Sequence, residues 1–422
     1  MNGSGVTQTP ARRAALIFIF FTVLIDILAF GLIIPVLPHL IKTIGHYDFG
    51  QAAVVSGWFS VAFSAIQFVF APLLGALSDR YGRRRVILIS CFGLAVDFTF
   101  MALATSIPMF FIGRVVSAMT SASFSTANAY LADVTAPEKR AAAFGLLGSA
   151  FGIGFVIGPA LGGLLGGIDL RLPFYVASGL AALNFLYGLF VLPESLPAES
   201  RTPRFEWKRA NPIGVLLVLK RYPAVLGLIA VSFLSQLAHF VLPSTFVLYA
   251  DYRYGWGEQQ VGYVLGLVGI CNVFVQAFLI RRLVPKIGER KALLFGLLFG
   301  MLGFAWQGLA ETGMLSLLAI PLLALWGLAN PSLQAIITKQ VHADEQGGLQ
   351  GAVASMTSLA GIFAPFLFTH TFALFIGAQA PMQIPGAAFL LASAALALAI
   401  GLAWRQTAWM KPSRPSGHNV PV

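Results

Sequence analysis

The chain has 422 residues, of which 58% are hydrophobic and only 10% are charged, and its excess of lysine and arginine gives a formal charge of +11. A soluble globular protein usually carries about 25% charged residues. This composition therefore excludes a soluble globular protein and predicts a membrane protein. The basic excess does not indicate nucleic-acid binding, because the basic residues are confined to short segments between apolar runs.

Twelve apolar runs are long enough to cross a bilayer as helices, which takes about 20 residues each. The first six are expected over 15–41, 52–78, 86–106, 108–131, 141–167 and 173–192. The last six are expected over 223–250, 261–280, 292–310, 314–338, 349–377 and 384–404. We therefore predict an all-α polytopic membrane protein with a six-helix half at 1–192, a linker rich in charge and proline at 193–221, and a second six-helix half at 222–422.

Lysine and arginine are distributed unevenly between the two sides of this topology. One side carries both termini, the linker and the segment Gly75–Arg85, which holds four arginines and one aspartate. The other side has only Lys42, Arg171 and Arg253. Because positive charge is retained on the cytoplasmic side of a membrane, we expect the termini and the linker in the cytoplasm.

The two halves share a weak internal repeat. A single offset aligns 81–88 with 287–294 and also aligns Gly145 with Gly351, Ser149 with Ser355, and Pro159 with Pro365. Such parallel duplication is typical of transporters, whose substrate cavity lies between the repeats near the bilayer midplane.

Several motifs resemble those of the major facilitator superfamily, and the resemblance covers essentially the whole chain. The segment Gly75–Arg85 looks like the superfamily's signature loop between helices 2 and 3. The stretch Gly154–Gly163 in the fifth run is similar to the motif of its proton-coupled antiporters. Together with Asp26 in the first run and Asp97 in the third, the chain looks most like the tetracycline-efflux group of twelve-helix drug/proton antiporters.

The resemblance has two departures. In the fourth run, Arg114 matches the arginine that the superfamily's antiporters carry there. Ala118 stands at the later position where these antiporters usually have a glycine. Asn272 stands near the position where the tetracycline pumps carry a histidine. The resemblance therefore implies drug/proton antiport more strongly than it implies tetracycline as the substrate.

Three charged residues lie deep in the apolar runs: Asp26, Asp97 and Arg114. Each costs about 2.5 to 3.5 kcal/mol at a helix centre, so a functional role is the default. A carboxylate without a counter-ion in an apolar surrounding favours its protonated form. We expect Asp26 to exchange a proton for a substrate cation with Arg114 biasing its protonation, and Asp97 to be a second coupling acid or the partner of Arg114 in a structural pair. The alternative for Asp26 is a cap on backbone freed by nearby prolines.

Polar side chains in other runs are candidates for the cavity lining, with interhelical hydrogen bonding as the open alternative. They are Gln67, Gln236, His239, Asn272, Gln276, Gln307, Asn330 and Gln334.

Two motifs are expected to control how the two halves of the protein open and close. The predicted cytoplasmic gate consists of Gly75, Asp79, Arg80, Gly82, Arg83 and Arg84, with Asp79 placed against the start of the eleventh helix near 347–348. The predicted antiport motif consists of Gly154, Gly158, Pro159, Gly162 and Gly163 and would seal the two halves against leak. Ordinary packing of small residues is the alternative for each glycine.

The sequence thus predicts a proton-coupled antiporter that exports amphiphilic, cationic or zwitterionic drugs, with tetracycline-like compounds among them. Its expected partners are protons, the small-molecule substrate and the lipid of a bacterial inner membrane, in which it would act as a monomer. A proton symporter or facilitator for a sugar or organic anion is the first alternative, and a transport-inactive receptor or scaffold is the second. We expect neither an enzyme nor a metal or other cofactor, because the runs contain no grouping of nucleophile, base and orienting residue and no metal-ligand cluster.

Overall fold

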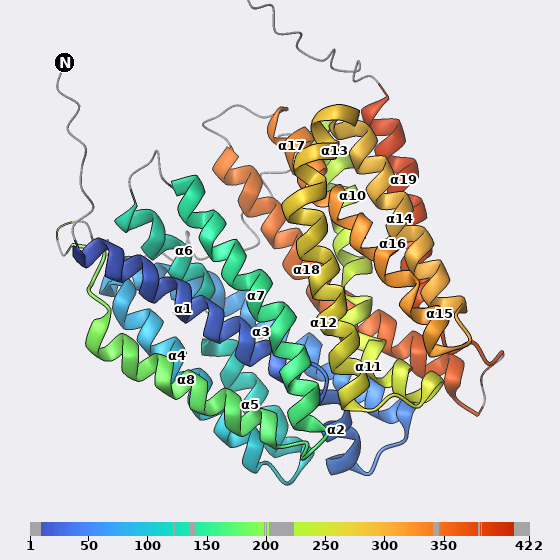
Figure 1. Cartoon of the computed structure of the whole chain (residues 1–422), viewed down its shortest axis with the longest axis horizontal. Helices are drawn as coiled ribbons and strands as arrows, with labels where there is room; N and C mark the ends of the chain where they lie inside the picture. Colours follow the sequence, from blue (N-terminus) through green and yellow to red (C-terminus); the bar gives the residue numbers. More distant parts are fainter. Residues whose placement is uncertain are drawn as a thin grey trace, which may run out of the picture. The chain divides into compact units, whose positions relative to one another are not determined.

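The computed structural model describes residues 10–120, 123–135, 140–197, 199, 201, 223–340, 346–378, 380 and 382–408. Within these residues every regular element is a helix (Figure 1). Most of the predicted linker lies outside them. The chain divides into two compact units, of which unit 1 comprises Met1–Pro212 and Trp256–Gly266, and unit 2 comprises Ile213–Gly255 and Leu267–Val422.

Unit 1 is a bundle in which α1 packs most extensively against α7 and also against α8, while α4 packs against α5 and α8. Figure 1 shows α1 and α7 side by side. The helices are α1 (Pro10–Ile33), α2 (Leu37–Gly45), α3 (Phe49–Tyr81), α4 (Arg83–Leu103), α5 (Ile107–Thr120), α6 (Ser123–Val134), α7 (Arg140–Gly166) and α8 (Leu172–Val191).

The first predicted span is broken rather than continuous. It consists of Ile17–Ile33 and Leu37–Gly45, which meet at an angle of 43°. Pro35 lies in the break and Pro38 lies in the first turn of α2, where a missing backbone N–H costs no helix hydrogen bond. The expectation of one helix over 15–41 is therefore corrected at this point.

The turn between α3 and α4 recurs in unit 2. Gly82 ends α3 with a φ of 101°, and Gly288 ends α13 with a φ of 82°, a backbone conformation that favours glycine. The helices that follow, α4 and α14, each have 21 residues. Pro159 in α7 and Pro365 in α18 likewise lie inside helices. The repeat seen in the sequence is thus present in the helices.

Unit 2 contains several helices that are interrupted within one span. A π-helical turn, η4 (Val275–Leu279), separates α12 from α13, and a 3-10 turn, η5 (Trp326–Leu328), separates α16 from α17. The helices are α10 (Pro223–His239), α11 (Val241–Tyr254), α12 (Glu258–Phe274), α13 (Ile280–Ile287), α14 (Glu289–Leu309), α15 (Gly313–Leu317), α16 (Ala319–Leu325), α17 (Ala329–Thr338), α18 (Gln346–Ile376) and α19 (Ala387–Thr407). The residues of α12 up to Gly266 belong to unit 1.

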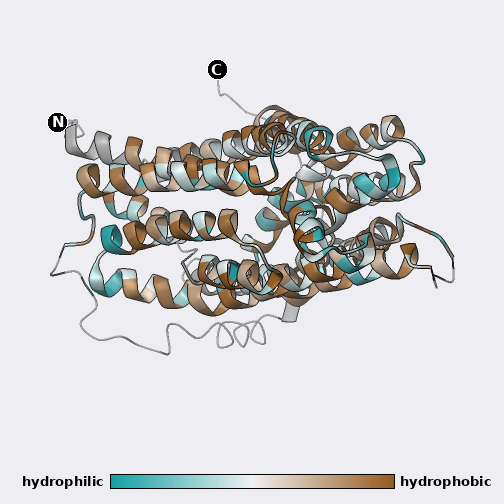
Figure 2. Cartoon of the chain, turned by 90° about the horizontal axis from the view of Figure 1, so that it is seen from below, coloured by the Kyte–Doolittle hydropathy of each residue, from teal (hydrophilic) through white to brown (hydrophobic). Residues whose placement is uncertain are grey.

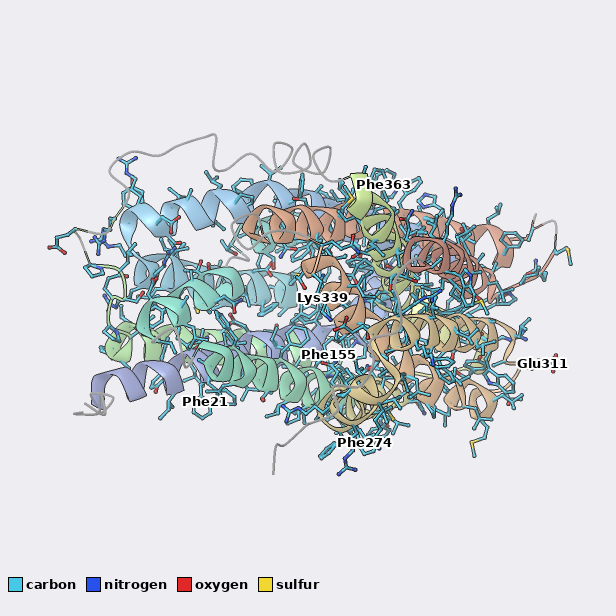
Figure 3. All side chains as sticks on the ribbon, turned by 90° about the horizontal axis from the view of Figure 1, so that it is seen from above. Phe21, Phe155, Phe274, Glu311, Lys339 and Phe363 are labelled. Carbon is cyan, nitrogen blue, oxygen red and sulfur yellow. The ribbon has the colours of Figure 1, made fainter. Side chains whose placement is uncertain are left out.

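Hydrophobic residues predominate along the helices (Figure 2). Among the described residues, ten helices are long and apolar enough to cross a membrane, the bent α1–α2 pair makes an eleventh, and Ile107–Thr120 is a shorter apolar helix. Phe21 and Phe274 point outward from their helices, as expected for side chains that face lipid (Figure 3). The predicted all-α polytopic fold is confirmed.

Candidate functional site

Asp26 lies on α1, the helix that packs against α7 and α8. Asn184, fully buried on α8, donates from Nδ2 to Asp26 Oδ1 at 3.5 Å. Thr22, one turn earlier on α1, donates from Oγ1 to Asn184 Oδ1 at 3.2 Å. The threonine thereby orients the amide of Asn184 with its N–H groups toward the acid. The Asp26 side chain is half-buried, whereas its neighbour Asn184 is closed off from solvent.

Asp97 on α4 and Arg114 on α5 are both buried, with exposed fractions of 1% and 8%. They interact electrostatically, and Asp97 also faces the Ser117 hydroxyl on α5. Gly113 permits the close approach, because a methyl group on its α-carbon would lie 3.2 Å from Asp97 Oδ1. The Arg114 guanidinium lies 4.4 Å from the ring centroid of Phe63 on α3, which adds a cation–π contact. The structure thus brings Asp97 and Arg114 together in a buried cluster.

The two acids occupy separate polar sites along α4. Asn184 Nδ2 also lies 3.5 Å from Cys91 Sγ, so the site of Asp26 is beside Cys91. Cys91 and Asp97 lie about 9 Å apart along the axis of α4, at about 1.5 Å per residue. Sequence reasoning missed Asn184, because a single asparagine in an apolar run looks the same whether it supports an acid or simply bonds to a neighbouring helix.

The glycines of the predicted antiport motif lie where α7 meets other helices of unit 1. A methyl group at Gly158 would lie 2.8 Å from the α-carbon of Gly31 on α1, and one at Gly154 would lie 2.9 Å from the Ile27 side chain. A methyl group at Gly162 would lie 2.7 Å from the carbonyl carbon of Leu32, with the carbonyl oxygen closer still.

Gly163 faces a different helix, since a methyl group there would lie 2.7 Å from the α-carbon of Gly262 on α12. Pro159 contributes to both surfaces: its ring approaches Gly31, and its carbonyl oxygen lies 2.6 Å from where a Gly262 methyl would be. The motif therefore lets α7 pack closely on α1 and on the start of α12.

The segment Gly75–Arg85, which connects α3 to α4, is organised by Arg83. Its guanidinium forms an ion pair with Asp79 one turn earlier and donates to Ser78 Oγ at 2.6 Å. It also donates from Nε to Asp133 Oδ2 at the end of α6, at 3.2 Å. Ser78 in turn donates to the carbonyl of Gly75 at 2.7 Å. The predicted partner of Asp79 belongs to α18 in unit 2, and that contact stays a prediction.

Glu194, which follows α8, caps the start of α4. Its Oε1 accepts hydrogen bonds from the backbone N–H groups of Arg83 and Arg84 at 2.8 and 3.4 Å. Gly82 is required beside it, because a side chain there would overlap the Glu194 carboxylate. Arg84 also donates from Nη2 to the Leu189 carbonyl at 2.7 Å. These contacts fasten the segment to the end of α8.

Asp133 and Glu194 were not among the predicted gate residues. Each is an acid just beyond an apolar run, and this signal alone does not distinguish a gate residue from a solvated loop acid. Arg80 has no comparable role in the described contacts; its guanidinium lies 5.1 Å from the ring centroid of Tyr81.

The cavity candidates of unit 2 have varied surroundings. Gln236 on α10 donates to Thr357 Oγ1 on α18 at 3.4 Å, and His239 lies 5.6 Å from Trp326, ring centroid to ring centroid. Gln307 is buried and donates to Ser316 Oγ at 2.8 Å, which supports the interhelical alternative for this residue.

The remaining cavity candidates differ in exposure. Gln276, in η4, and Asn330 are exposed, whereas Gln67, Asn272 and Gln334 are half-buried. Gln67 is on α3 of unit 1, and the other four are on helices of unit 2.

The structure describes a polytopic helical protein in which Asp97 and Arg114 are buried among apolar helices, an arrangement typical of membrane transporters. The family is given by a match to the model of the Major Facilitator Superfamily over residues 19–365, and the chain belongs to this family.

Similar proteins include tetracycline resistance proteins. The class C protein of Escherichia coli is 36% identical over 85% of this chain and 90% of its own length, and the class G protein of Vibrio anguillarum is 36% identical over 87% and 92%. The fold is similar to that of a bacterial homologue of the human lysosomal transporter Spinster in an inward-facing, unoccupied conformation. That structure matches with a TM-score of 0.77 at 16% identity, over 95% of this chain and 98% of that one.

Proposed function

We propose that this transporter is a proton-coupled antiporter that exports amphiphilic, cationic or zwitterionic compounds of the tetracycline type. The observation that carries the proposal is the contrast between its two interior acids. Asp26 is half-buried and held by the Asn184 amide, whereas Asp97 is buried against Arg114. A half-buried acid held by a neutral donor is suited to exchange a proton for a cationic substrate. The names of the similar resistance proteins support a drug as the substrate.

In the proposed cycle, Asp26 alternates between a proton and a substrate cation. Arg114 stays compensated by Asp97, so we assign the exchange to the carboxylate of Asp26. A membrane potential of 100 mV supplies about 2.3 kcal/mol for each charge that moves inward. Alternating access would arise from rocking of the six-helix halves, 1–192 and 222–422, against each other.

The charge distribution along the sequence supports an orientation in the membrane. We propose that both termini and Gly75–Arg85 face the cytoplasm of a bacterium and that the protein works as a monomer in the inner membrane. The ion pair of Arg83 with Asp79 would then belong to a cytoplasmic gate, with Asp79 exchanging between Arg83 and the start of α18.

The test is Asp26→Asn, with Glu311→Gln as the matched control. Glu311 is an exposed acid in the segment between the end of α14 and the start of α15 (Figure 3). The control therefore replaces a carboxylate by an amide, as Asp26→Asn does, but away from the interior. Cells that express each variant are tested for drug susceptibility with and without an uncoupler, and inverted vesicles are tested for drug-dependent proton release.

We expect Asp26→Asn to abolish both the drug resistance of the cells and the drug-dependent proton release from the vesicles, while the purified protein remains monodisperse. Glu311→Gln should retain both activities. Unimpaired drug-driven proton movement in Asp26→Asn would refute the role of this acid. Accumulation of a sugar or organic anion in place of drug export would favour the symporter or facilitator alternative.

A further inference from the structure

A close contact between a histidine and a glutamate joins α2 to the first residue of α12. His39 Nδ1 lies 2.8 Å from Glu258 Oε1, and the two side chains are 7% and 22% exposed. Both residues belong to unit 1, because Trp256–Gly266 is part of that unit. They are distinct from the polar sites around Asp26 and Asp97, and neither is part of the motifs described above.

The pair is located where three helices converge. A methyl group at Gly163 on α7 would lie 2.5 Å from the backbone oxygen of Glu258, and one at Gly166 would lie 3.4 Å from Glu258 Cβ. A side chain at Gly166 would also overlap Val36 in the break before α2. The end of α7 thus packs closely against the start of α12 and against the break before α2.

Helix α12 is shared between the two units. Its first residues, up to Gly266, belong to unit 1, and the helix belongs to unit 2 from Leu267 onward. The π-helical turn η4 follows it directly, and such turns occur frequently at functional sites. Any change in how the start of α12 is held by α2 and α7 therefore acts on a helix that continues into unit 2.

We propose that His39 and Glu258 form a second proton-binding site, in which protonation of His39 fastens α2 to the start of α12. Histidine is the side chain whose charge ordinarily changes between about pH 5 and 8. With His39 protonated, the contact joins two opposite charges, and their attraction in this largely buried position is stronger than it would be in water. With His39 neutral, the attraction between opposite charges is lost. Acid therefore favours the contact, and the contact weakens as the pH rises through the titration of His39.

Other charged groups on the surrounding elements must be separated from this effect. They are Lys42 on α2, His46 directly after it, Asp48 directly before α3, Arg114 on α5, and Asp169 and Arg171 after α7. Two of the cations have contacts of their own: Lys42 Nζ lies 3.4 Å from the Phe49 ring centroid, and Arg171 donates to the Ala102 carbonyl at 2.6 Å. His46 is an exposed histidine directly after α2, the helix of His39, and provides the natural control.

The consequence for transport rests on the proposed function and orientation. Helix α2, which carries His39, precedes α3, and Gly75–Arg85 lies at the other end of α3, which is about 50 Å long at about 1.5 Å per residue. In the proposed orientation the pair is therefore at the outer side of the membrane. Protons arriving from outside would protonate His39 and close the contact between α2 and α12 as they enter the transport cycle.

The experiment measures the contact itself rather than transport. Spin labels are attached at Thr43→Cys on α2 and Gln260→Cys on α12, both exposed positions, in a background with Cys91→Ala and Cys271→Ala. Distances between the labels are measured by pulsed electron resonance from pH 5.5 to 8.5. We expect two populations of molecules, one with a short and one with a long distance between the labels. The ratio of the short-distance to the long-distance population should fall by about 5- to 150-fold as the pH rises over this range, which is the span typical of coupled sites.

Four variants decide the origin of this change. His39→Gln and Glu258→Gln should each abolish the pH dependence, and His39→Arg should keep the short distance at every pH, which also guards against a simple folding defect. His46→Asn should retain the pH dependence, because asparagine tolerates the positive φ of 51° at this position.

A pH profile that is absent in the parent protein, or unchanged by His39→Gln or Glu258→Gln, would overturn the inference. Because the measurement needs neither drug nor a proton gradient, its failure is distinguishable from failure of the proposed antiport.

Discussion

Replacement of Gly162 by alanine should separate α7 from α1, whereas the same replacement at Gly148 should not. A methyl group at Gly162 would lie 2.7 Å from the carbonyl carbon and 2.8 Å from the α-carbon of Leu32, all backbone atoms that no rotamer change can move away. A methyl group at Gly148, on an exposed face of the same helix, has no atom to meet within 4 Å. The two variants therefore add the same methyl group to the same helix, once against the backbone of Leu32 and once at a position with no neighbouring atom within 4 Å.

The magnitude follows from two opposing effects. Alanine is favoured over glycine inside a helix by about 0.8 to 1.0 kcal/mol, and this gain applies to both variants. At Gly162 the backbones must also separate toward ordinary contact distances, and overpacking of this kind costs about 1 to 3 kcal/mol. Since the contact of α1 with α7 is the most extensive in unit 1, we expect a net loss of up to about 2 kcal/mol for Gly162→Ala and a gain of up to about 1 kcal/mol for Gly148→Ala.

The assay uses a cysteine of the protein as its reporter. Cys91 is a buried free thiol, and Cys271→Ser removes the second one, so reaction with a thiol-sensitive dye during heating reports unfolding around Cys91. Gly162→Ala should lower the midpoint of this transition and Gly148→Ala should raise it or leave it unchanged. If both midpoints shift equally in the same direction, close packing of α7 on Leu32 does not stabilise the protein.

Three further predictions concern charged residues. Arg114→Leu leaves Asp97 buried without its counter-charge and should cost about 3 to 5 kcal/mol, most of which Asp97→Asn in the same chain should restore; equal thermal stability of the single and double variants would contradict this. Glu194→Ala removes the carboxylate at the start of α4 and should cost about 1 to 3 kcal/mol, with faster hydrogen exchange at the first turn of α4, whereas Glu199→Ala, at an exposed acid, should change neither. Asp79→Asn should slow transport while drug affinity is kept, and a selective loss of drug binding would assign this residue to the cargo site instead.

Most helices could be predicted from hydrophobicity alone. The fifth and sixth runs, expected over 141–167 and 173–192, correspond to α7 at Arg140–Gly166 and α8 at Leu172–Val191. Agreement is this close because a lipid-spanning helix is defined by a local property, a long apolar run that ends at charge or at a turn residue. The break at 34–36 was foreseeable only as a proline irregularity, since prolines permit a bend but neighbouring helices decide its angle.

The sequence by itself also identified the interior charges, because Asp26, Asp97 and Arg114 are conspicuous in apolar surroundings and costly to place there. What only the tertiary structure decided is which groups meet. Asp97 is beside Arg114 and Asp26 is beside Asn184, and His39 reaches Glu258 across more than half the length of the chain. The hydrophobicity of a segment can be read from its own residues. Which polar side chains pair depends instead on which helix faces come together, and that is a property of the packed bundle.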